Sequence, residues 1–79
     1  MKRETIEQTV IAITSKVLGT PEHEIEVEST LEDLTVDSLD CVEILMDCEK
    51  EFNLVIPDES AEACTTVKEI CDMIESLIN

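Results

Sequence analysis

One serine stands where a helix is expected to begin, directly after a residue type that caps helices well. Ser38 follows Asp37, and apolar periodicity predicts a helix from Asp37 to about Phe52. The Ser38 hydroxyl would then lie near unpaired backbone amides and the positive end of the helix dipole, where a phosphate is stabilised. A serine in a first helical turn is also ordinary capping chemistry, so its position alone leaves both roles open.

The chain offers little for catalysis or calcium binding. Serine hydrolysis needs a base for Ser38, but His23 is the only histidine and no G-x-S-x-G motif is present. A phosphate-cradling loop needs several glycines, and Gly19 is the only one. A calcium loop of the EF-hand type would have Thr35 or Leu39 at its third position, which are not ligands of that pattern. We expect no enzymatic activity and no dedicated metal site.

Four cysteines could suggest a metal site or disulfides, but their spacing favours burial. They form two pairs with a separation of seven residues, which is two helical turns, and therefore repeat on one helix face: Cys41, Cys48, Cys64 and Cys71. Structural zinc sites use closer pairs, and no second histidine is available. Buried apolar thiols are the favoured interpretation, followed by metal ligands and then by disulfides.

The composition is strongly acidic. The 79 residues hold 20 acids and 5 bases, a net charge of −15, and between positions 21 and 63 Lys50 alone opposes fifteen acids. Such a surface repels nucleic acid and anionic membranes, and it favours a basic partner. No apolar stretch approaches the ~20 residues of a membrane span, and no apolar segment follows the N-terminal charges. We expect a cytoplasmic protein that does not insert into membranes.

The first part of the chain predicts a helix followed by a long ordered loop. Thr5 and Gln8 form a possible capping box, and Gly19 with Pro21 ends the helix. The helix is indicated by apolar residues at helical spacing, namely Ile6, Val10, Ile13 and Val17. The loop, from about residue 20 to 36, is pinned by Ile25, Val27, Leu31 and Leu34. Alternation over residues 24–28 resembles a strand, but no second strand candidate could pair with it.

Two more helices follow the central one. Asp58 is a possible cap for a short helix to about Ala63, and Thr66 with Glu69 forms a capping box for a final helix. That helix is expected to bury Val67, Ile70, Cys71, Ile74, Leu77 and Ile78. The prediction is an all-α, small four-helix bundle with three longer helices, one short helix and a long ordered loop between helices 1 and 2. It forms a single domain over residues 1–79.

The central helix carries two apolar stripes where one would suffice. One stripe, expected to face the core, consists of Cys41, Leu45, Cys48 and Phe52, with Ile44 at its edge. The second consists of Leu39, Val42 and Met46, flanked by Asp40, Glu43, Asp47 and Glu49. Its members are either ordinary exposed aliphatics or a docking surface whose acids steer a basic partner. Periodicity does not decide between these interpretations.

The residues around the serine resemble a known family. Residues 34–40, LTVDSLD, are similar to the Asp-Ser-Leu attachment motif of acyl carrier proteins. The resemblance continues through Val42 and Glu43, residues 49–52, residues 56–59, Ala61 and Glu62, and residues 65–67. It covers essentially the whole chain, including its length and acidity.

The resemblance implies a specific function. A phosphopantetheinyl transferase would esterify Ser38, within the motif Asp37, Ser38 and Leu39, to 4′-phosphopantetheine, whose thiol carries acyl groups as thioesters. Type II fatty acid synthesis is the expected pathway, and a polyketide or other specialised acyl pathway is the alternative. A remoter alternative is an acidic helical interaction module without a prosthetic group. We expect a non-catalytic monomer.

The resemblance also assigns partner and cargo residues. Basic patches of the partner enzymes would dock on Leu39, Asp40, Val42, Glu43, Met46, Glu49, Asp58, Glu59 and Glu62, with Asp37 beside them. Candidates for lining an acyl pocket are Cys41, Leu45 and Ile70. The chain departs from the family pattern at Thr35 and Val36, where Gly-Ala or Gly-Val is usual, at Lys50, often acidic, and in its four cysteines. These departures are expected to bear on partner choice.

Overall fold

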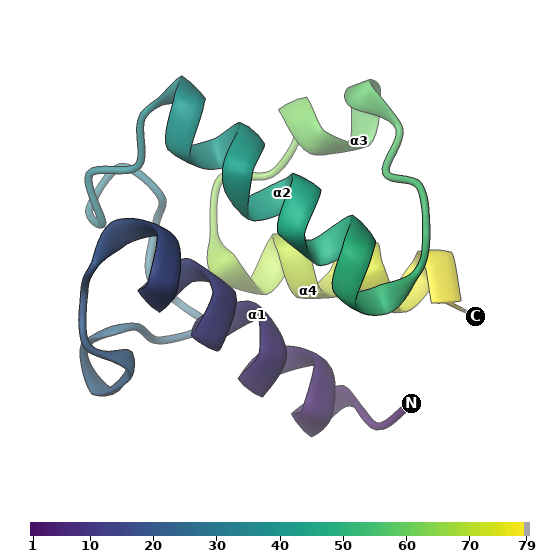
Figure 1. Ribbon diagram of the computed structural model, residues 1–79, viewed down its shortest axis with the longest axis horizontal. Helices are drawn as coiled ribbons and strands as arrows, with labels where there is room; N and C mark the ends of the chain where they lie inside the picture. Colours follow the sequence, from purple (N-terminus) through teal and green to yellow (C-terminus); the bar gives the residue numbers. More distant parts are fainter. Residues whose placement is uncertain (79) are drawn as a thin grey trace.

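Residues 1–78 are described by a computed structural model, and within them the architecture is helical (Figure 1). The elements are α1 (Arg3–Leu18), the 3-10 turn η1 (Glu22–Glu24), α2 (Ser38–Phe52), α3 (Asp58–Glu62) and α4 (Val67–Ile78). Three longer helices and one short helix, with a long connection between α1 and α2, confirm the predicted fold class.

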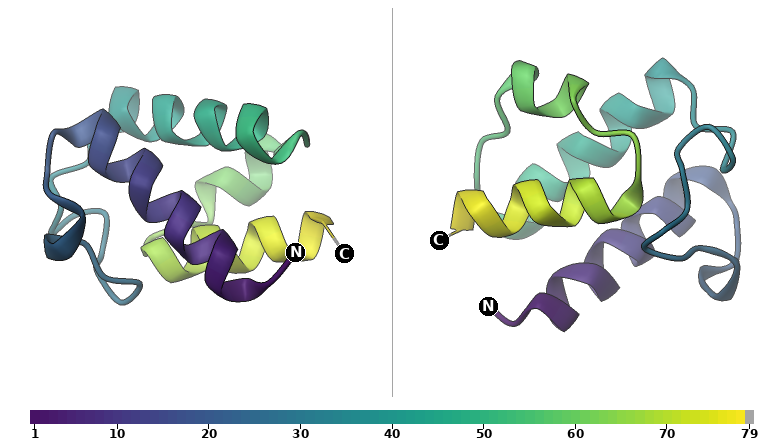
Figure 2. Two further views of the ribbon diagram at one scale, coloured as in Figure 1. Left: turned by 60° about the horizontal axis from the view of Figure 1, so that its bottom comes forward. Right: turned by 180° about the vertical axis from the view of Figure 1, so that it is seen from behind.

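The helices enclose an aliphatic core. Helix α1 packs against both α2 and α4, and the two termini lie at one end of the bundle while the long loop lies at the other (Figures 1 and 2). Helix α2 therefore begins at the loop end. The core residues are Ile6, Val10, Ile25, Ile44, Leu45, Cys48, Ile56, Val67, Ile70, Cys71 and Ile74. These branched side chains and thiols fill the space that aromatic residues would take in many small domains.

The loop between α1 and α2 is ordered by contacts with the start of α4. The Lys68 amide donates to the Val27 carbonyl at 2.8 Å, and the Leu31 amide donates to the Thr65 carbonyl at 3.0 Å. Between them, Thr30 and Thr66 form an isolated antiparallel bridge. Ile25 is buried in the core. The residues with strand-like alternation, 24–28, form no strand, and only the Val27 carbonyl bonds to α4; the backbone pairing lies further on, at Thr30 and Leu31. The prediction of an ordered loop is confirmed.

Two predicted helix starts are wrong. Helix α1 begins at Arg3 with Lys2 as its N-cap, so Thr5 lies inside the first turn and forms no capping box with Gln8. An earlier start is stabilised because the Arg3 guanidinium pairs with Glu7 on α1 and with Asp72 and Glu75 on α4, at 2.9, 2.7 and 3.2 Å.

Helix α3 begins at Asp58 itself, with Pro57 at the cap position, so the predicted cap at Asp58 is also wrong. Proline is well suited to the entry of a helix because its backbone φ is already fixed near the helical value. The predicted end of α1 and the predicted start of α4 are confirmed. Gly19 closes α1 in the left-handed conformation at φ 72°, and Thr66 and Glu69 exchange hydrogen bonds of 3.1 Å in a capping box.

Burial differs from the predicted pattern at three places. Leu77 and Ile78 are both expected in the core, but Leu77 is 39% exposed and Ile78 is half-buried. Ile44 is fully buried, whereas Phe52 and Cys41 at the ends of the predicted core stripe are half-buried, because the buried face of α2 is centred nearer Ile44. Thr14 is buried without having been predicted so, since its hydroxyl donates to the Val10 carbonyl at 2.8 Å and brings no unpaired polar group into the core.

Candidate functional site

Ser38 is the first residue of α2 and is exposed to solvent. The capping role belongs to its neighbour, because Asp37 Oδ1 accepts a hydrogen bond from the Asp40 amide at 2.8 Å. Asp37 is thereby confirmed as the N-cap. Since Asp37 satisfies the helix end, the Ser38 hydroxyl is left for other chemistry beside the positive end of the α2 dipole.

The approach to Ser38 is a tight turn with an unusual backbone. The Val36 amide donates to the Leu31 carbonyl at 2.9 Å, and the Thr35 amide donates to the Glu32 carbonyl at 3.0 Å. Thr35 has φ 58°, in the left-handed region that a β-branched residue rarely adopts. The turn before the serine therefore has the geometry that a glycine would adopt without strain, and this chain forms it with threonine.

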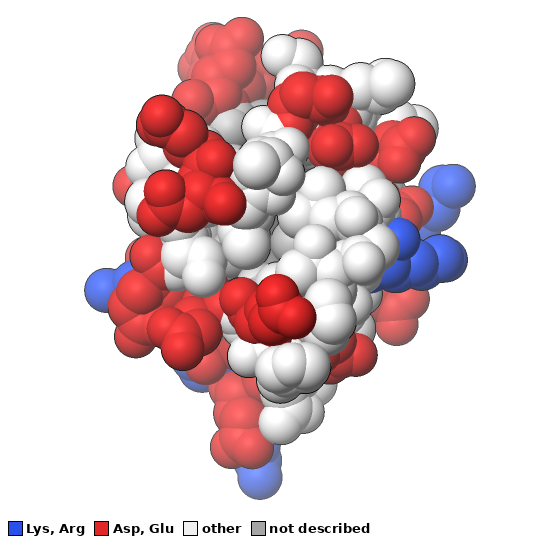
Figure 3. Space-filling model, turned by 90° about the vertical axis from the view of Figure 1, so that its left-hand side faces the viewer, with Lys and Arg blue, Asp and Glu red and all other residues white. Residues whose placement is uncertain are grey.

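The second apolar stripe of α2 lies on the surface. Leu39, Val42 and Met46 are 68%, 51% and 50% exposed. Figure 3 looks onto the loop end of the bundle, where acidic side chains surround uncharged surface and basic ones lie at the margins. An exposed apolar stripe with an acidic surround has the composition of an interaction surface.

The predicted docking acids do not all lie in similar surroundings. Glu43 is exposed on α2, Asp40 is half-buried, and the three acids of α3 are exposed, namely Asp58, Glu59 and Glu62. Glu49 is different because its carboxylate accepts a hydrogen bond from the Ile56 amide at 2.8 Å. Glu49 thus joins α2 to the segment that leads into α3, a structural role that the sequence pattern did not reveal.

A cavity of about 540 Å³ opens beside Ser38, and we call it the Ser38 cavity. Cys41 and Leu45, two of the acyl-pocket candidates, line it together with Ser38, whereas Ile70 lies in the core and is not part of its wall. The remaining lining residues are Leu31, Val36, Asp37, Val42, Asp58, Ala61, Glu62 and Cys64. Sequence reasoning missed Leu31, Val36 and Cys64 as lining residues, although their apolar character within an acidic segment was the available signal.

The four cysteines are free thiols, two of them fully buried. Burial raises the pKa of Cys48 to about 12 and that of Cys71 to about 11. Cys41 and Cys64 line the Ser38 cavity, and burial raises the pKa of each above its ordinary value. All four thiols are therefore protonated at neutral pH and behave as small apolar side chains.

Comparison with known proteins decides the family. The family model described as "Phosphopantetheine attachment site" matches residues 8–74. The chain is 47% identical over 75 residues to an acyl carrier protein of Rubrobacter xylanophilus, an alignment that spans 94% of this chain and 93% of the relative. The chain belongs to the acyl carrier protein family. It also superimposes on the crystal structure of an acyl carrier protein from Thermotoga maritima with a TM-score of 0.85 and 28% identity, covering 99% of this chain and 92% of the other.

Membership fixes the general chemistry. Acyl carrier proteins are non-catalytic carriers, and the phosphopantetheine attachment domain identifies 4′-phosphopantetheine as the prosthetic group. Carriers of this family interact with a phosphopantetheinyl transferase and with acyl-handling enzymes. An exposed hydroxyl beside a helix N-terminus fits the attachment of a phosphate-containing group. Within the described part of the chain, no helix has the length and apolar character needed to cross a membrane.

Proposed function

We propose that Ser38 is the attachment point of 4′-phosphopantetheine and that the carrier delivers acyl intermediates to the enzymes of type II fatty acid synthesis. The observation that supports this most directly is the pairing of roles at the start of α2. Asp37 caps the helix through the Asp40 amide. The neighbouring Ser38 hydroxyl is exposed and opens onto a cavity.

The residues around Ser38 suit a phosphodiester there. The helix dipole of α2 stabilises an anion at this position, and the Ser38 side chain is exposed to solvent. Phosphopantetheine, when attached, supplies a terminal thiol that holds acyl groups as thioesters. The protein contributes position, accessibility and shelter, and it needs no base of its own because the transferase catalyses the attachment.

The Ser38 cavity suits the shelter of an acyl chain. Cys41 and Leu45 offer apolar wall, and the protonated thiol of Cys41 behaves there as a small apolar group. Ile70, the third candidate, is fully buried in the core and does not line the cavity. We infer that a tethered acyl chain enters here and is protected from water.

Partner enzymes would dock on α2 and α3. Apolar contact is offered by Leu39, Val42 and Met46, and charge complementarity to a basic patch is offered by Asp40, Glu43, Glu49, Asp58, Glu59 and Glu62. The same surface would receive the transferase, since it surrounds Ser38. We further propose that residues 1–79 form one acyl carrier domain that acts as a monomer.

The location proposed for this carrier is the cytoplasm. Its four cysteines are free rather than joined in disulfides, as is usual in a reducing compartment. Coenzyme A, the donor for the transferase, would have to be present in the same compartment.

Mass spectrometry of the intact protein tests the attachment. Incubation with a purified phosphopantetheinyl transferase and coenzyme A should add one phosphopantetheine to the protein, and Ser38→Ala should abolish the addition. Ser60→Ala, a matched serine removal on α3, should leave it unchanged. A protein that the transferase never modifies, or one modified equally in the Ser38→Ala variant, would refute the assignment.

The pathway is tested on material from the native host. Mass spectrometry of the acyl species on the carrier should show saturated and β-hydroxy chains of graded length if fatty acid synthesis is the pathway. Polyketide-type chains would instead assign a specialised pathway, and a consistently unmodified protein would favour an interaction module without a prosthetic group.

A further inference from the structure

Two of the four cysteines line the same cavity as Ser38. These two residues, Cys41 and Cys64, are half-buried, so part of each side chain is open to the cavity and to solvent. Cys48 and Cys71 are fully buried and do not belong to the wall of the Ser38 cavity. The protein therefore holds one pair of thiols that a molecule in the cavity can contact and one pair that it cannot.

The two cavity thiols come from different elements and lie near each other. Cys41 follows Ser38 by three residues on α2, and residues at this spacing are neighbours on a helix surface. Cys64 lies in the turn after α3. Burial, the Glu69 carboxylate and a charge on Cys41 each raise the pKa of Cys64, in this order of size. An interaction between the two thiols agrees with their place in one cavity wall, because charge effects weaken with distance.

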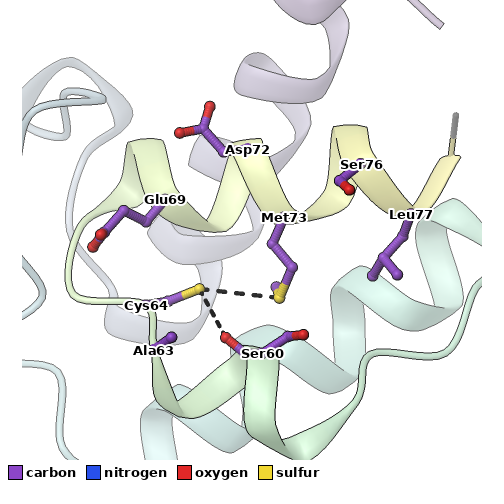
Figure 4. A pocket seen from close by; sticks show the side chains of 8 residues that line it. All are labelled: Ser60, Ala63, Cys64, Glu69, Asp72, Met73, Ser76 and Leu77. Atoms are coloured by element: carbon purple, nitrogen blue, oxygen red, sulfur yellow. Dashed lines mark hydrogen bonds between the residues drawn. The ribbon is translucent and has the colours of Figure 1, made fainter.

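Cys64 is weakly held and can move within this wall. Figure 4 shows its two contacts, in which the thiol lies 3.4 Å from the Ser60 carbonyl oxygen and 4.0 Å from the Met73 sulfur. A thiol is a weak hydrogen-bond donor. Helix α3 contributes no buried residue, and few buried contacts mark a segment that opens at low free energy. Cys64 can therefore approach a second sulfur in the cavity, whereas Cys41 is held by α2.

A phosphopantetheine arm on Ser38 would bring a third sulfur to the two thiols. The cavity of about 540 Å³ lies in the range of about 300–1,000 Å³ usual for small-molecule sites. A group on a short flexible tether has an effective concentration in the millimolar range at a site within its reach. The end of the arm would thus meet Cys41 and Cys64 far more often than a free molecule does.

We propose that Cys41 and Cys64 form a dithiol site that reduces a disulfide on the carrier's own phosphopantetheine arm. The substrate is a mixed disulfide between the arm sulfur and a small thiol of the glutathione type. Such a disulfide forms when the arm thiol reacts with an oxidised small-molecule disulfide, and it leaves no thiol to accept an acyl group. The inference rests on the proposed function, because it assumes that the arm is attached to Ser38.

The reaction consists of two thiol–disulfide exchanges. Cys41 releases its proton to water, and its thiolate attacks the arm sulfur. The bond between the arm sulfur and the small thiol breaks, and the small thiolate leaves and takes up a proton. The Cys64 thiolate, after losing its own proton to water, then attacks the Cys41 sulfur and releases the arm as a thiolate that is protonated. The arm sulfur and the small thiol are reduced, and Cys41 and Cys64 are oxidised to a disulfide.

The surroundings of the two thiols favour this order of attack. Burial alone raises the pKa of Cys41, whereas the pKa of Cys64 is raised by burial and also by the carboxylates of Glu69 and Asp72. The thiolate is the attacking form, so Cys41 is the better first nucleophile. Cys64, on the weakly held turn, is the thiol that moves to complete the disulfide.

Mass spectrometry of the oxidised carrier tests the proposal. The holo carrier, loaded at Ser38 by the transferase, is treated with oxidised glutathione, and the remaining free thiols are alkylated. The protein should carry no glutathione, an alkylated arm and a disulfide between Cys41 and Cys64. Cleavage after Glu43 by a glutamyl protease separates Cys41 from Cys48 and so identifies the pair. The carrier without the arm should form this disulfide more slowly, because glutathione disulfide then reaches the thiols only by diffusion.

Three variants assign the steps, with circular dichroism to show that each is folded. Cys64→Ser should trap the arm in a disulfide with Cys41, whereas Cys41→Ser should leave glutathione on the arm. Cys48→Ala removes a buried thiol outside the cavity and should react as the original protein does.

Two results would overturn the inference and leave the proposed function intact. The first is glutathione that persists on the arm of the original carrier, and the second is an equal rate of disulfide formation with and without the arm. Failure of the transferase to modify Ser38 would overturn the proposed function and the inference with it.

Discussion

The Glu49 carboxylate accepts a hydrogen bond from the Ile56 amide at 2.8 Å, across seven residues of sequence. This contact links the last turn of α2 to the segment that enters α3. Ile56 is 7% exposed and belongs to the core, so its amide has limited access to water. The sequence predicts only a docking role for Glu49, and the structure adds a second role, which is to hold the segment before α3 against α2.

Removing this acceptor should lower stability. Glu49→Ala leaves the Ile56 amide without its partner, and we expect a loss of about 1–3 kcal/mol in the free energy of unfolding, measured by urea denaturation. Glu49→Gln keeps an acceptor oxygen and should lose less. Glu51→Ala on the same helix, exposed, serves as the control and should change stability by no more than about 0.5 kcal/mol. Equal losses in Glu49→Ala and Glu51→Ala would show that the hydrogen bond contributes nothing.

Replacing Thr35 with glycine should increase the stability of the folded protein. The Thr35 φ of 58° costs a non-glycine residue about 1–2 kcal/mol, and part of this is recovered on substitution because glycine adopts the region freely. We therefore expect Thr35→Gly to raise the free energy of unfolding by about 0.5–1 kcal/mol in a urea titration. Asn53, at φ 53°, is the matched control: asparagine tolerates this region, so Asn53→Gly should gain less. A destabilised Thr35→Gly protein would mean that the Thr35 hydroxyl, 2.6 Å from the Leu34 carbonyl oxygen, outweighs the strain.

The part of the fold that could be predicted from sequence is the part specified by neighbours along the chain. Helical periodicity located the longer helices, and Asp37 located the start of α2 because a cap acts on an amide three residues away. The start of α1 was mispredicted because Arg3 reaches Asp72 on α4, a contact that no local pattern contains. Leu77 was mispredicted because helical spacing gives the face of a residue but not whether another element covers it.

The candidate site also combines features set by neighbouring residues with features set by contacts between distant segments. Ser38 and the second apolar stripe were visible as residue types at defined spacing, whereas the Ser38 cavity depends on how the long loop and α3 approach α2. Leu31 and Cys64 meet in one cavity wall although they lie far apart in sequence. Sequence periodicity could not have placed them together.

The exposed stripe of α2 predicts variants that lose partners without losing structure. Met46 is 50% exposed, so Met46→Ala should change the free energy of unfolding by no more than about 0.5 kcal/mol. Glu43→Lys reverses a charge on the same surface and should reduce kcat/KM of the phosphopantetheinyl transferase for the carrier, with a larger effect at low salt.

The control for these variants is Glu51→Lys, the same charge reversal on the part of α2 that borders a hollow beside α1. It should leave transferase kinetics unchanged. Circular dichroism that shows unfolded Met46→Ala protein would mean that this side chain belongs to the core. Equal losses of kcat/KM in Glu43→Lys and Glu51→Lys would mean that the transferase responds to the net charge of the carrier and not to a contact at Glu43.

The buried thiols predict a loss of stability in alkali. The pKa of Cys48 is about 12 and that of Cys71 about 11 in the folded protein, both above the value of about 8.5 for an unfolded cysteine. Below that unfolded value both states hold the proton, and the stability is fully present. As pH rises beyond it, the unfolded chain releases protons that the folded one retains. Stability should therefore fall by up to about 1.4 kcal/mol per pH unit for each buried thiol.

Urea denaturation at a series of pH values from neutral to alkaline measures this slope. Cys48→Ala should start from a lower stability at neutral pH because it leaves a cavity, yet its decline with pH should be shallower since one titrating group is gone. Cys41→Ala, which removes a half-buried thiol from α2, is the control and should reduce the slope less. The chain has no tyrosine to titrate in the same range. A decline of equal steepness in the original protein and in Cys48→Ala would show that deprotonation of this buried thiol does not set the alkaline limit.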